Sequence, residues 1–60
     1  MMNTNIIGDM DKKIQNLRKL AEDIAEQGKE IESVKRNTKR LLASVKMLEL
    51  NICDINDLIQ

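Results

Sequence analysis

Apolar residues recur in alternating steps of three and four from Met10 to Ile59, and no proline interrupts them. Residues spaced in this way share one side of an α-helix, so the repeat predicts a helix with a continuous apolar stripe. A stripe with a seven-residue period is buried when two or more helices wind around one another with a left-handed twist. The repeat therefore predicts an all-α chain that assembles in a coiled coil.

The heptad positions follow when Gln27 is placed at position d. The a and d positions then hold the apolar residues that we expect at the interface between helices: Met10, Leu17, Leu20, Ile24, Ile31, Val34, Leu41, Val45, Leu48, Ile52 and Ile55. Three polar residues occupy the same stripe: Lys13, Gln27 and Thr38. We expect Gln27 and Thr38 to form polar layers within the core.

One uninterrupted helix is predicted over residues 9–60. Helix-forming residues dominate this segment, and at 1.5 Å per residue about fifty of them would make a rod about 75 Å long. Gly28 is the one internal candidate for a turn, but helix formers flank it on both sides. A helical hairpin that turns at Gly28 is therefore the less favoured alternative.

The N-terminal segment, residues 1–8, is expected to be frayed. Asp9 directly follows a glycine and has the acidic side chain that suits the first turn of a helix, so it is the expected N-cap. Thr4 or Asn5 would instead cap an earlier start that includes Ile6 and Ile7.

The apolar stripe is wider than a two-stranded coiled coil requires. Four residues at the neighbouring e positions broaden it: Ile7, Ile14, Ala21 and Leu42. Wide stripes favour bundles of more than two helices, although β-branched residues at a with leucine at d favour a parallel dimer. We weigh the width more heavily and expect a parallel coiled coil of three or four helices.

Gln27 is the most informative exception in the stripe. A buried amide has two donor hydrogens and an acceptor oxygen, and leaving one of these groups unsatisfied costs about 1–3 kcal/mol. Gln27 therefore either fixes the register of a homo-oligomer or meets a polar side chain, such as an arginine, on a different helix.

A central glutamine at d, with apolar layers before and after it, resembles the SNARE motif. The stretch "EQGKEIESV" is similar to the surroundings of the central glutamine in the first, Qb-type helix of synaptosome-associated SNAREs. The resemblance covers nearly the whole chain and places Gln27 in the polar layer of a parallel four-helix bundle. It implies a helix that zips with three partner helices, three of the four contributing Gln and one Arg, and so drives membrane fusion.

Two residues depart from that family's pattern. Lys13 stands where an apolar layer is expected, and Cys53 lies at an outward position of the helix rather than in the cysteine cluster that follows the first helix in such proteins. The SNARE-type helix is the preferred function, and two alternatives also fit the heptad repeat. One is a homo-oligomerisation stalk, trimeric or tetrameric, of a larger protein, and the other is a helix of a permanent hetero-oligomeric scaffold.

Composition sets limits on the chemistry of the chain. Ten basic and ten acidic residues balance, and aromatic residues and histidine are absent, so we expect no nucleic-acid partner, no metal, no cofactor and no enzymatic activity. The expected partners are other coiled-coil helices, with a hetero-tetramer preferred over a homo-oligomer. The expected location is cytoplasmic, with membranes reached only indirectly through partners or an anchor.

Overall fold

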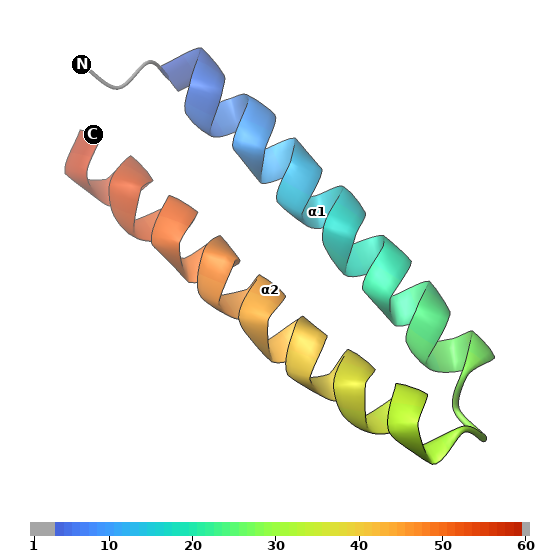
Figure 1. The fold of residues 1–60 in the computed structure, drawn as a ribbon. Helices are drawn as coiled ribbons and strands as arrows, with labels where there is room; N and C mark the ends of the chain where they lie inside the picture. Colours follow the sequence, from blue (N-terminus) through green and yellow to red (C-terminus); the bar gives the residue numbers. More distant parts are fainter. Residues whose placement is uncertain (1–3, 60) are drawn as a thin grey trace.

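The structure of the protein, a computed structural model, describes the backbone of residues 4–59 and the side chains of residues 6–54. This part of the chain forms two α-helices, α1 (Thr4–Gln27) and α2 (Glu32–Ile59). They lie side by side and antiparallel, joined at one end by residues 28–31, in a hairpin of 45 × 15 × 14 Å (Figure 1). The predicted all-α class is confirmed.

The prediction of one continuous helix over residues 9–60 is wrong, because the chain reverses direction at Gly28. The Gly28 N–H donates to the Ile24 carbonyl oxygen at 2.8 Å, and the Ile31 N–H then donates to the Gly28 carbonyl oxygen at 2.9 Å. The Ile31 carbonyl oxygen accepts from the Lys35 N–H at 2.9 Å, which makes Ile31 the N-cap of α2. These bonds pair three backbone N–H groups in and beside the turn, and the helix formers on both sides do not prevent it.

Gly28 lies where the turn leaves no room for a side chain, so glycine is the residue that fits at this position. The residue is buried, and a Cβ atom at this position would collide with Cγ1 of Val34. The same atom would lie 3.0 Å from Val34 Cβ and 3.2 Å from the Ile24 carbonyl oxygen. Its φ angle is not positive, so glycine is required here for close approach and not for a left-handed backbone.

The start of α1 also differs from the expectation. The helix begins at Thr4 and not at Asp9, so residues 4–8 of the segment expected to fray are helical, while residues 1–3 lie outside the described part. Ile7 explains the difference. Its side chain is buried against α2, and this burial stabilises the first turns of the helix.

The core of the hairpin is one row of side chains on each helix. The buried residues recur every seven positions, as Ile7, Ile14 and Ala21 in α1 and then Gly28 in the turn. In α2 they are Thr38, Val45 and Ile52. Four of these form a single apolar cluster: Ile7, Ile14, Val45 and Ile52. The partly buried Met10 packs against this cluster. Burying such a side chain contributes about 1.5–3 kcal/mol, so this row holds the two helices together.

Neighbouring helices within the chain are antiparallel, whereas the expected bundle has parallel neighbours. The antiparallel arrangement follows from the short turn, since a chain that reverses within four residues returns along itself. How many helices any larger assembly contains stays a prediction.

Candidate interaction surface

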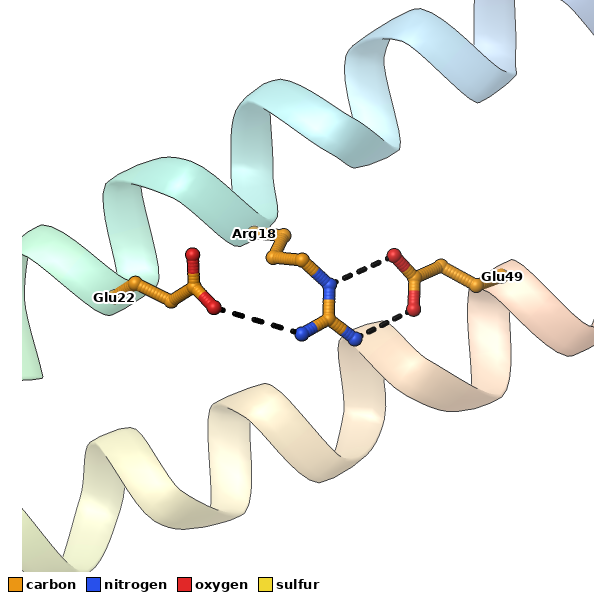
Figure 2. A network of polar contacts seen from close by, with 3 residues as sticks. All are labelled: Arg18, Glu22 and Glu49. Carbon is orange, nitrogen blue, oxygen red and sulfur yellow. Dashed lines mark hydrogen bonds and ion pairs between the residues drawn. The ribbon is translucent and has the colours of Figure 1, made fainter.

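A bidentate ion pair closes one side of the hairpin. Arg18 on α1 donates from Nε to Glu49 Oε2 at 2.8 Å and from Nη2 to Glu49 Oε1 at 2.6 Å (Figure 2). Its remaining nitrogen, Nη1, lies 3.7 Å from an oxygen of Glu22, one turn further along α1. A planar guanidinium matches a carboxylate in this two-point geometry, so the pair fixes how α1 and α2 are rotated relative to each other.

The ion pair shifts the titration of both partners. The hydrogen bonds from Arg18 hold the pKa of the Glu49 carboxyl below its ordinary value of 4.5, with partial burial opposing the shift and the charge of Lys46 adding to it. The hydrogen bond to Glu49 likewise raises the pKa of Arg18. Both side chains are about one third exposed, so water screens the attraction and the pair acts mainly on geometry.

The opposite side of the hairpin is apolar. Leu17 and Arg18 flank the buried row of α1 on its two sides, and Leu48 and Glu49 flank the buried row of α2 in the same way. Because Arg18 and Glu49 meet on one side, Leu17 and Leu48 lie together on the other. Leucine and isoleucine residues continue this second side along α1, and Leu41 continues it along α2.

We call this second side the apolar face. It consists of side chains that are 37–60% exposed: Ile6, Leu17, Leu20, Ile24, Leu41 and Leu48. Scattered exposed apolar residues are ordinary, but a contiguous set rimmed by polar residues marks an interaction site. The face is the strongest candidate for function in the described part of the chain.

The two residues expected in polar core layers lie in different surroundings. Thr38 is buried between the helices, and its hydroxyl donates to the carbonyl oxygen of Val34 at 2.8 Å and lies 3.1 Å from that of Lys35. Its polar group is therefore satisfied within α2. Gln27 is exposed at the end of α1, so it forms no layer inside the hairpin.

The residues expected at the interface divide into two groups. Val45 and Ile52 are buried within the hairpin, and Met10 and Val34 are partly buried. The others are exposed, five on the apolar face and Ile31 in the turn, while the side chain of Ile55 lies outside the described residues: Leu17, Leu20, Ile24, Leu41, Leu48 and Ile31. Lys13 is exposed as well and pairs with Asp9 at 2.9 Å.

The a and d assignment omits the row through which α1 contacts α2. Ile7, Ile14 and Ala21 occupy e positions, which widen the apolar stripe without belonging to its centre. The width of the stripe is the signal that indicates this row. The partner of Arg18 is thirty-one residues away at Glu49, and no local spacing indicates that pair.

The remaining polar clusters are surface groups. The basic residues Lys35, Arg36, Lys39 and Arg40 are all exposed, and the one cysteine, Cys53, is exposed and free. Among the described residues no group of side chains is arranged to hold a metal ion, and no cavity is found. None of the helices in this part of the chain is long and apolar enough to cross a membrane.

Comparison with protein-family models, with curated proteins and with solved structures finds no match to this chain. The apolar face and the ion pair opposite it are therefore the basis for a functional proposal.

Proposed function

We propose that this chain is an oligomerisation element, a helical hairpin that assembles with further copies through its apolar face. The observation that carries the proposal is the contrast between the two sides of the hairpin. One side is closed by Arg18 and Glu49, whereas the other exposes leucine and isoleucine on α1 and two leucines on α2. Covering such a face removes apolar surface from water and so favours association.

The small core of the hairpin supports the same proposal. Five apolar residues of the described part are buried: Ile7, Ile14, Ala21, Val45 and Ile52. A chain of about 60 residues with so few buried side chains gains stability from disulfides, a metal or association. With a single cysteine an internal disulfide is excluded, so association is the source that this sequence offers.

The experiment is sedimentation equilibrium of the full chain, with circular dichroism on the same samples. Wild type is expected at a multiple of the 6.9 kDa chain mass. The substitution Leu48→Glu places a charge on the apolar face of every copy. It should weaken association by about a hundredfold or more, because each buried leucine contributes about 1.5–3 kcal/mol.

The matched control is Leu50→Glu. Leu50 is 48% exposed and Leu48 is 42% exposed, but two residues along a helix point in different directions, so Leu50 lies off the apolar face. Leu50→Glu should therefore leave the mass unchanged. A wild-type chain of 6.9 kDa at all concentrations, or an equal effect of the two substitutions, would contradict the proposal.

A second candidate is a SNARE-like helix that zips with three partner helices. The observation that favours it is the heptad phase, since the a positions Ile24, Ile31 and Thr38 keep a seven-residue spacing straight through the turn. A continuous rod would need residues 28–31 to become helical, and it would bring Gln27 onto the same stripe. Gly28→Ala separates the two candidates, because it stabilises a continuous helix and disturbs the hairpin.

A further inference from the structure

We infer that the apolar face is covered by one second copy of this chain, with both turns at the same end and α1 of each copy lying on α2 of the other. The inference rests on the proposed oligomerisation and gives it a stoichiometry and a geometry. The assembly is a four-helix bundle with two-fold symmetry in which every helix is antiparallel to its neighbours.

The exposed area of the hairpin fits one partner copy. The chain exposes 5043 Å², whereas a compact monomeric protein of 6.9 kDa exposes about 4,000 Å². The excess of about 1,000 Å² is close to what each subunit contributes to a stable dimer, roughly 800 Å² or more. The formal net charge of the chain is +0, so two copies approach without net repulsion.

The two helices contribute unequally to the apolar face, and this selects how the copies stack. On α1 the face is broad, since Leu20 and Ile6 continue it beyond Leu17. On α2 it is narrow, because the positions beyond Leu41 and Leu48 hold small or polar residues: Asn37, Ser44 and Asn51. Placing α1 on α2 of the other copy matches the broad half with the narrow half.

The opposite stacking, α1 on α1 and α2 on α2 with the turns at opposite ends, is less favourable on two counts. It buries the polar residues Asn37, Ser44 and Asn51 of α2 against the same residues of the second copy, so neither set meets an apolar partner. It also brings Asp9 close to Asp23 of the second copy, since each lies near one end of α1. Stacking α1 on α2 instead places Asp23 near Arg40 of the second copy, which is the attractive combination.

The test combines the mass of the assembly with the distance between the two turns. Sedimentation equilibrium of the full chain should give a dimer, twice the chain mass of 6.9 kDa. For the distance, a nitroxide label is attached to Glu30→Cys in a Cys53→Ser background and measured by pulsed electron paramagnetic resonance. Both positions are exposed, so neither change disturbs packing.

Turns at the same end should give one label separation of about 20–25 Å, roughly two helix diameters. Turns at opposite ends would give a separation near the 45 Å length of the hairpin and would overturn the inference. A trimer or tetramer would overturn it too, yet would leave oligomerisation through the face standing. A monomer would refute both. The labelled Leu48→Glu variant is the control, because it should lose the inter-copy distance, whereas labelled Leu50→Glu should keep it.

Discussion

The half of the hairpin beside the turn and the half at the open end are packed by side chains of different size. Toward the turn, the buried rows hold Ala21, Gly28 and Thr38, whereas toward the open end they hold isoleucine and valine. The same gradient runs along both helices. Small residues allow close approach of the two backbones beside the turn, and large residues fill the space farther from it.

The difference separates two roles. The turn half sets the geometry of the hairpin, because only a glycine fits against Val34 and Ile24 at position 28. The open half supplies most of the buried apolar surface, because the apolar cluster lies there. Substitutions that make a buried side chain smaller should therefore destabilise the hairpin most at the open end. Substitutions that make a side chain larger should destabilise it most at the turn.

Ile14→Ala is the substitution with the largest expected effect. Ile14 is 9% exposed and belongs to the apolar cluster, so removing its side chain leaves a cavity and should lower the free energy of unfolding by about 2–5 kcal/mol. The measurement is urea unfolding followed by circular dichroism at one fixed protein concentration. Leu50→Ala, at an exposed position, should change the value by about 0.5 kcal/mol or less. Equal effects of the two would show that the open end is not the core.

Gly28→Ala tests the turn half. The added methyl group meets Val34 and the carbonyl oxygen of Ile24, so the hairpin should lose about 1–3 kcal/mol of stability in the same unfolding experiment. The matched control is Gly8→Ala in α1, where nothing lies within 4 Å of the added atom. It should gain about 0.5–1 kcal/mol, because alanine is the better helix residue. A gain at both glycines would indicate a continuous helix.

The heptad repeat predicts most of the helical structure but does not predict where it folds back. Helix content, the apolar stripe and its width all follow from local spacing. Within the predicted helical segment, residues 9–60, α1 and α2 cover all described residues except the turn, residues 28–31. The reversal at Gly28 depends on a gain that is not local. Folding back buries Ile7 and Ile14 against Val45 and Ile52, which lie more than thirty residues away along the chain. The helix propensity of the residues around the turn does not depend on that contact and so cannot predict it.

The sequence predicts only part of the candidate surface, because the rest depends on contacts between residues that are far apart along the chain. Leucines at a and d positions, such as Leu17 and Leu48, are expected from their spacing to lie at an interface between helices. Within the hairpin they are exposed on the apolar face, so that expectation stays a prediction. The spacing does not predict how α1 is rotated about its axis relative to α2. In the hairpin the e positions of α1 are buried in place of the a positions, which corresponds to a rotation of the helix by a fraction of a turn. The Arg18 and Glu49 contact holds this rotation, and it joins residues whose pairing only the folded chain defines.

The smallest expected effect on stability comes from the ion pair between Arg18 and Glu49, which lies between the two halves of the hairpin. The pKa of Glu49 is lower in the hairpin than the ordinary value of 4.5, chiefly because Arg18 donates hydrogen bonds to it. In the unfolded chain the carboxyl takes up a proton near its ordinary pKa, while in the hairpin it stays ionised to lower pH. The stabilisation is therefore complete above about pH 4.5 and is lost as the pH falls through the lower folded pKa.

Glu49→Gln isolates this contribution, because all other carboxyl groups are the same in the two proteins. At neutral pH the variant should be slightly less stable than wild type, by less than either Ile14→Ala or Gly28→Ala, because Arg18 and Glu49 are partly exposed and Glu22 remains beside Arg18. Urea unfolding from pH 7 downward should show the two proteins converging below about pH 4.5. A difference that stays constant across this range would mean that Glu49 acts through packing alone, and the rotation of α1 would then depend on the row of Ile7, Ile14 and Ala21.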